Sequence, residues 1–168
     1  MFLIFDTFFI KHCYEVYYKE IFDIRPIMKN FFLCTTEAVK NEIVHYELDN
    51  FLEISEFMIF PLEQKDFTRA YSKNSLIKEL DEADQSIWIV SDSNRDQDML
   101  VLTDDGALTL ECYLSDIKSF RLLGFLLFLL ENDLISKNRV HKCLKYWNKV
   151  GRYSQKHIKR WKKDLREY

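Results

Sequence analysis

The sequence predicts an α/β fold, in which helices cover both faces of a parallel sheet of four or five strands. Short apolar runs alternate with longer segments whose apolar residues recur at helical spacing, as in chains that build parallel sheets. The 168 residues include only three glycines and two prolines, too few for an all-β protein with many tight turns. The apolar fraction of 48% is enough for one hydrophobic core.

The first half of the chain supplies three candidate strands. Each is a short apolar run, and they cover residues 2–5, 31–34 and 57–60. Residues 7–22 carry apolar groups at helical spacing, and Pro26 marks a break because proline disfavours helix in the residue before it. Thr35 or Thr36 is expected to cap the helix that follows the second strand.

The second half continues this alternation and then becomes entirely helical. Residues 64–79 are expected to form an amphipathic helix, and Asp81 to cap the next one. A fourth strand is expected over residues 98–103 and a fifth over residues 117–120. The remaining helices are expected over residues 106–114, 122–131, 136–148 and 154–166, with Gly151 at the last break.

Charge is divided unevenly along the chain. Residues 137–168 contain 12 of the 24 Lys and Arg residues but only two acids, Asp164 and Glu167. The first 136 residues therefore hold 25 of the 27 acids. An acidic body with a basic tail fits a site for cations beside a surface for polyanions. The alternative is a pair of solvated basic helices without a ligand.

Cysteine spacing and hydropathy indicate the cellular compartment of the protein. The four cysteines lack the CxxC spacing of a zinc site and are expected to be buried, reduced thiols: Cys13, Cys34, Cys112 and Cys143. Asp6 interrupts the apolar start, which does not resemble a signal peptide. The longest apolar stretch, residues 122–130, is far shorter than the ~20 residues of a membrane span. These features predict a cytoplasmic protein.

Acidic residues directly follow two of the expected strands. Asp6 follows the first strand, and Asp104 and Asp105 follow the fourth. Because ligands of open parallel sheets bind just beyond the carboxyl ends of the strands, these acids are expected to face one cleft. Glu42, after the second strand, and Asp84, in the first turn of the helix that Asp81 caps, are expected to join them.

Each of these acids also has a purely structural explanation. The alternative for Asp6 is that it only ends a strand, and the sequence from Asp104 to Gly106 favours a turn. Asp84 is favourable near a helix N-terminus in any case, and Glu42 suits a helix surface. The functional interpretation therefore depends on a fold that gathers the four.

Clustered carboxylates are stable only when they bind protons or a cation, because their charges repel. Carboxylate ligands without a histidine partner select Mg²⁺ or Mn²⁺. The chemistry that fits best is hydrolysis of a phosphodiester, in which the metal acidifies the attacking water. A phosphatase with an Asp nucleophile is disfavoured, since Phe8 stands where its second Asp is expected.

The acids stand in motifs that resemble those of the PIN domains. The motifs are an apolar strand ending in Asp, then V-x-x-E, A-D-x-S and T-x-D. In this sequence the strand ends at Asp6, and the other three motifs lie in order at Val39–Glu42, Ala83–Ser86 and Thr103–Asp105. The resemblance implies a three-layer α/β/α nuclease domain over residues 1–130, with residues 131–168 as a basic helical extension packed on it. It also implies an Mg²⁺- or Mn²⁺-dependent ribonuclease, often the toxin of a VapC-type pair with an antitoxin partner, and often a homodimer.

By position, the resemblance makes four acids catalytic: Asp6, Glu42, Asp84 and Asp105. The metal ligands it implies are Asp6, Asp84 and Asp105, with Asp104 as an adjacent candidate. Glu37 is the competing assignment for the second acid. Thr7 and Thr103 are expected to hydrogen-bond the carboxylates or the attacking water.

The basic tail supplies the candidate RNA contacts. Four basic residues of the last helix are expected to bind phosphates: Lys156, Lys159, Arg160 and Lys163. Trp147 and Trp161 lie between basic residues, where they either stack on bases or pack with Leu144 against the body. Two functions remain open: a metal-dependent endoribonuclease, and a PIN-like module that binds nucleic acid or serves as a scaffold without cutting.

Overall fold

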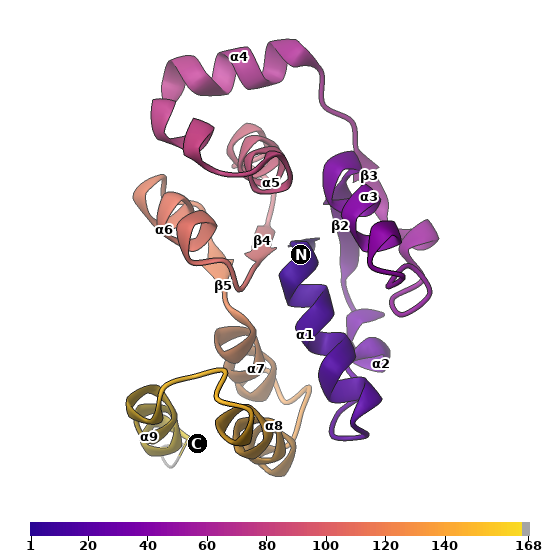
Figure 1. Cartoon of the computed structure of the whole chain (residues 1–168), viewed down its shortest axis with the longest axis vertical. Coiled ribbons are helices and arrows are strands. Elements are labelled where there is room, and N and C mark those ends of the chain that lie inside the picture. The colour runs from indigo at the N-terminus through magenta and orange to yellow at the C-terminus, as the bar shows by residue number, and fades with distance from the viewer. Residues whose placement is uncertain (166–168) are drawn as a thin grey trace.

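Five parallel strands form one sheet in the order β3-β2-β1-β4-β5 (Figure 1). Their bounds are β1 Phe2–Phe5, β2 Phe32–Thr36, β3 Met58–Phe60, β4 Met99–Leu102 and β5 Ser119–Phe120. The computed structural model describes residues 1–165, apart from the side chains of Ile54 and Asp164. The predicted α/β class with a parallel sheet is confirmed, and the sheet has five strands.

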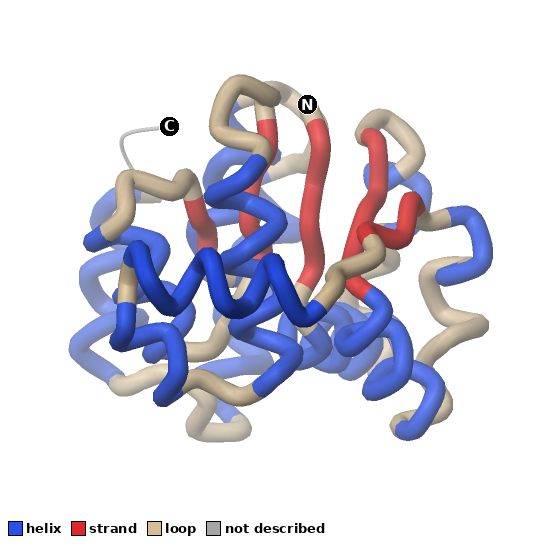
Figure 2. The backbone as a smooth tube through the Cα atoms, turned by 90° about the horizontal axis from the view of Figure 1, so that it is seen from above, coloured by secondary structure: helices blue, strands red, loops and turns tan. Residues whose placement is uncertain are grey.

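Helices surround this sheet, and Figure 2 shows them in front of the strands and behind them. The α-helices are α1 Thr7–Tyr18, α2 Arg25–Met28, α3 Glu37–His45, α4 Gln64–Lys73, α5 Glu82–Ser93, α6 Gly106–Leu114, α7 Leu122–Glu131, α8 Lys137–Lys149 and α9 Gln155–Asp164. Two 3₁₀ helices, η1 Ile54–Glu56 and η2 Ser75–Glu79, complete the secondary structure of the described part. The α5 and α6 helices lie on one side of the sheet, and α1 and α7 on the other (Figure 1).

Two helical segments differ from their predictions. The segment predicted as one helix over residues 64–79 is divided at Asn74, whose backbone is extended and whose side chain accepts a hydrogen bond from Leu76 N at the start of η2. Arg25 is helical although it precedes a proline, because Asp23 Oδ1 accepts from both its backbone N and its Nε. A local side-chain hydrogen bond thus overrides the usual preference before proline.

Capping residues set the starts of the helices at the carboxyl edge of the sheet. Thr36, rather than Thr35, caps α3 by accepting from Val39 N. Asp81 caps α5 as predicted, by accepting from Asp84 N. Each cap satisfies an amide of the first helical turn that has no partner within the helix.

The C-terminal helices pack on the body through apolar side chains. The α8 and α9 helices lie at the opposite end of the long axis from α4 (Figure 1). Trp147 and Leu144 of α8 are fully buried, and Trp161 of α9 packs partly buried against the core. The packing interpretation of the two tryptophans is confirmed. Of the helix predicted over residues 154–166, Arg166 lies outside the described residues.

The cysteines and the longest apolar helix agree with the expectations from sequence. All four cysteines are buried free thiols. Within the described part of the chain, no helix combines the length and apolar character needed to cross a membrane.

Candidate carboxylate site

Asp6 lies at the carboxyl end of the central strand β1 and caps α1. Its side chain is only 2% exposed. Oδ1 accepts from Phe8 N at 3.3 Å and Oδ2 accepts from Thr103 Oγ1 at 2.8 Å. Burial, helped by the charges of Asp105 and Glu42 and opposed by these two hydrogen bonds, raises the pKa of Asp6 to about 7.

Thr103 connects Asp6 to Asp105. Phe5 of β1 pairs with Leu102 of β4, so the residues after these two strands lie next to each other. Thr103 Oγ1 donates to Asp6 and accepts from Asp105 N at 2.9 Å. The Oδ1 atom of Asp105 accepts from Ala107 N and Leu108 N at 2.7 and 2.9 Å, which fixes this carboxylate as the cap of α6.

Asp84 approaches from the first turn of α5 and is 6% exposed. Burial is the largest cause that raises its pKa to about 8, followed in order by the charges of Asp6, Asp81, Asp105 and Glu42. The buried carboxyl of Asp84 therefore lies in the field of acids from several separate elements.

Glu42, on α3, is half-buried and faces the start of α1. Thr7 Oγ1 donates to Glu42 Oε2 at 2.6 Å. The prediction that Thr7 and Thr103 hydrogen-bond the carboxylates is confirmed by these contacts. Glu37, the competing candidate, is exposed and pairs with Lys40 at 3.2 Å, so the structure favours Glu42.

The fold thus brings four predicted acids to one edge of the sheet, close enough to shift the pKa of Asp6 and Asp84. Their oxygens do not surround one point: among the described side chains, no three His, Cys, Asp or Glu residues are placed to hold a metal ion. The chemistry of the donor set fits a hard divalent cation. The distances between the carboxylates fit such a cation only if the carboxylates move toward it.

Asp104 is turned away from these acids. Its Oδ2 contacts His12 Nδ1 at 2.6 Å and its Oδ1 accepts from Leu122 N at 3.1 Å. The Tyr153 hydroxyl donates to Oδ2 at 3.3 Å, and Arg121 Nε lies 3.5 Å from Oδ1. Burial opposes ionisation of Asp104, but the His12 bond and the neighbouring donors outweigh it and hold its pKa below the usual value. The structure therefore separates Asp104 from the other predicted metal ligands.

His12 and Arg152 were not singled out by the sequence, yet they join the body to the C-terminal extension. Arg152 Nη1 donates to His12 Nε2, and its Nη2 donates to Glu15 Oε2 at 2.5 Å. Arg152 therefore contacts two residues of α1, one of which also contacts Asp104. His12 and Arg152 are 140 positions apart, and no local pattern links residues at that distance.

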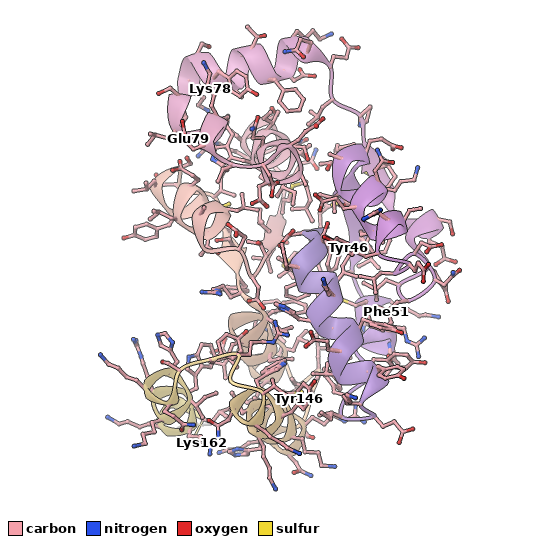
Figure 3. The ribbon with its side chains drawn as sticks, in the orientation of Figure 1. Tyr46, Phe51, Lys78, Glu79, Tyr146 and Lys162 are labelled. Carbon is pink, nitrogen blue, oxygen red and sulfur yellow. The ribbon has the colours of Figure 1, made fainter. Side chains whose placement is uncertain are left out.

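The predicted RNA-contact residues lie on the exposed surface of α9. Lys156, Lys159, Arg160 and Lys163 are all exposed, and none takes part in an ion pair within the described part of the chain. Figure 3 shows nitrogen-ended side chains directed outward from this helix, where Lys162 is labelled. Tyr153, just before α9, contacts Asp104, so the basic helix begins close to the carboxylate edge.

Fold and site together define an α/β protein with a five-stranded parallel sheet and a carboxylate cluster at the carboxyl end of its central strands. Comparisons with protein-family models, with curated proteins and with solved structures return no match for this chain.

Proposed function

We propose that this chain is a metal-dependent endoribonuclease that hydrolyses RNA phosphodiester bonds at Asp6, Glu42, Asp84 and Asp105. The observation that carries the proposal is the environment of Asp84. This buried carboxyl is surrounded by the charges of the other three acids and of Asp81, which raise its pKa to about 8 together with burial. Such a concentration of carboxyls destabilises a fold unless protons or a cation compensate it.

The four carboxylates would hold the cation. A bound Mg²⁺ or Mn²⁺ would supply charge neutralisation at the phosphodiester and would acidify an attacking water. Thr103 orients Asp6 and Thr7 orients Glu42, while the amides that begin α6 orient Asp105. Among the described residues, no hydrogen bond of this kind orients the Asp84 side chain, so Asp84 is the acid that we expect to move.

RNA is proposed as the substrate on two grounds. The order of the four motifs resembles that of the PIN domains, whose members include ribonucleases. The exposed basic residues of α9 offer phosphate contacts at an end of the molecule that is connected to the carboxylate edge through Tyr153.

The cleavage experiment compares the wild type with an Asp6→Asn/Asp84→Asn variant on a mixed RNA pool. With Mn²⁺, the wild type is expected to cut the RNA and the variant to show only background cleavage, because two of the proposed ligands lose their charge. Glu37→Gln is the matched control, since Glu37 is exposed and outside the cluster. Equal cleavage by the wild type and the double variant would contradict the proposed site.

Metal affinity is expected to rise steeply with pH. Asp6 and Asp84, with pKa values of about 7 and about 8, must release their protons before they bind a cation. Each released proton gives about a tenfold gain in affinity per pH unit, so between about pH 6 and pH 8 the gain is on the order of 100-fold or more. Isothermal titration with Mn²⁺ in buffers of different ionisation enthalpy measures both the affinity and the protons released.

The Asp84→Asn variant is the control for this titration. It is expected to release about one proton fewer and to show a shallower pH dependence. An affinity that does not change with pH would show that the cation, if bound, does not bind at these two carboxyls.

A second function, a nucleic-acid-binding or scaffold module that does not cut, is favoured by one observation. In the described residues no three potential ligands are arranged around a common point. This alternative predicts that RNA is retained by the protein with or without Mn²⁺ and is recovered uncut. The same cleavage experiment therefore separates the two functions.

A further inference from the structure

Helices α1 and α3 run side by side and lead away from the carboxylate site. Two contacts between their residues lie at successive helical turns. The first is the hydrogen bond from Thr7 to Glu42. The second is Lys11 Nζ, which lies 4.4 Å from the centroid of the Tyr46 ring. Lys11 and Tyr46 are each four positions after the residues of the first contact, so the second contact lies about one helical turn, or ~5.4 Å, further along.

Phe8 is a second aromatic residue close to Lys11. The Lys11 Nζ atom is also 5.8 Å from the centroid of Phe8, so one ammonium lies over both aromatic rings. Phe8 is 48% exposed and Tyr46 is 45% exposed, which leaves much of both rings in contact with solvent. The labelled Tyr46 lies beside α1 in Figure 3.

The position of Phe8 is tied directly to the site. Its backbone N donates to Asp6 Oδ1, two residues earlier in the chain. A ligand lying on the Phe8 ring would therefore have its neighbouring groups close to the carboxylates. The half-buried Lys11 supplies a positive charge at a place where Glu42 and Asp6 would otherwise repel a phosphate.

We propose that Phe8, Lys11 and Tyr46 form an aromatic platform that binds an unpaired stretch of RNA and leads it to the carboxylate site. Bases stack on the two rings, and Lys11 contacts the phosphate between them. The platform rests on the proposed function, because it names the substrate class of that same site as single-stranded RNA.

Single strands fit this arrangement better than duplexes. An exposed aromatic face binds any base whose own face is open, and paired bases in a duplex have no open face. Stacking is independent of base identity, so the platform predicts selection by strandedness rather than by sequence. A basic residue that lies close to both rings is suited to the backbone that joins two stacked bases.

The test measures binding apart from cleavage. The full chain carrying Asp84→Asn, which blocks the proposed cleavage, is titrated into a short fluorescein-labelled oligoadenylate and followed by fluorescence anisotropy. Phe8→Ala and Tyr46→Ala are each expected to weaken binding about tenfold, because each removes one stacking surface. Tyr46→Phe is expected to retain the wild-type affinity, since the ring remains.

Control variants and a control ligand separate the loss of the platform from the general effect of removing an exposed aromatic ring. Tyr113→Ala removes a 76% exposed ring from α6, away from the platform, and is expected to leave the affinity unchanged. Binding of a duplex of the same length is expected to respond to neither Phe8→Ala nor Tyr46→Ala. Urea unfolding of each variant confirms that it folds.

The outcomes distinguish the platform from the nuclease. If the oligoadenylate binds equally well to Phe8→Ala, Tyr46→Ala and their parent, or does not bind at all, the platform is overturned, and the cleavage experiment still decides the nuclease. If binding depends on the rings but the wild type does not cut, the platform stands and the nuclease is overturned. Equal losses for single strand and duplex would also contradict the platform.

Discussion

Asp84→Asn is expected to stabilise the protein at about pH 8 in the absence of divalent cations, by about 3 kcal/mol in the free energy of unfolding. The pKa of Asp84 is about 8 in the folded protein, against 3.8 for an ordinary aspartate. The whole difference corresponds to about 6 kcal/mol. About half of this is expected in practice, because the neighbouring carboxyls adjust their own protonation when Asp84 changes.

The effect has a definite dependence on pH. A carboxyl with a raised folded pKa contributes its full stability below the unfolded pKa near 4 and loses it as the pH rises through the folded pKa near 8. The variant and the wild type are therefore expected to differ little at about pH 4 and most at about pH 8. Urea unfolding in EDTA at both pH values measures this difference.

The control for this prediction is another acid of the same region. Glu37→Gln alters an exposed carboxylate paired with Lys40 and is expected to change stability by less than about 0.5 kcal/mol at either pH. A stability difference between Asp84→Asn and the wild type that is the same at both pH values would refute the assignment of Asp84 to a charged, buried cluster.

Trp147→Ala is expected to lower the free energy of unfolding by about 3–5 kcal/mol, because it removes the largest buried side chain of α8. The Trp147 ring is fully buried and packs edge-on against Tyr153, with centroids 5.8 Å apart. Tyr153 in turn bonds to Asp104, so the loss is expected to reach the contact between the extension and the edge of the sheet.

Trp147→Phe separates packing from hydrogen bonding. The Trp147 Nε1 atom is buried without a hydrogen-bond partner among the described residues, so phenylalanine removes volume and no bond. A loss of only about 1–2 kcal/mol is expected. Lys145→Ala, on the exposed side of α8, is expected to change stability by less than about 0.5 kcal/mol. Denaturant unfolding followed by circular dichroism measures all three variants.

Much of the fold could be predicted because its signals are local. The β1 strand is a run of four apolar residues, and α6 spans the predicted residues 106–114. Asp81 caps α5 because its side chain reaches the amide of Asp84 three residues later. The division at Asn74 and the helical Arg25 were not predicted, since local side-chain hydrogen bonds of Asn74 and of Asp23 accompany them.

The candidate site was predictable to the extent that it follows from strand ends. The acids after β1 and β4 had to lie near each other once these strands were neighbours, and their threonine contact follows from the register. The choice between Glu37 and Glu42 depended on which side of α3 faces Thr7, and spacing alone does not give that direction.

The sequence by itself determined the α/β class and the basic tail, because these depend on apolar periodicity and on residues close together in the chain. It indicated Asp6 and Asp105 through their places after two strands, and Glu42 and Asp84 mainly through the resemblance of their motifs. Only the tertiary structure decided which of Asp104 and Asp105 faces the cluster. Asp105 is held by the amides at the start of α6, whereas Asp104 is held by His12, 92 positions away, and by Tyr153. Partners that distant come together only when the core folds, and they direct neighbouring carboxylates to different surroundings.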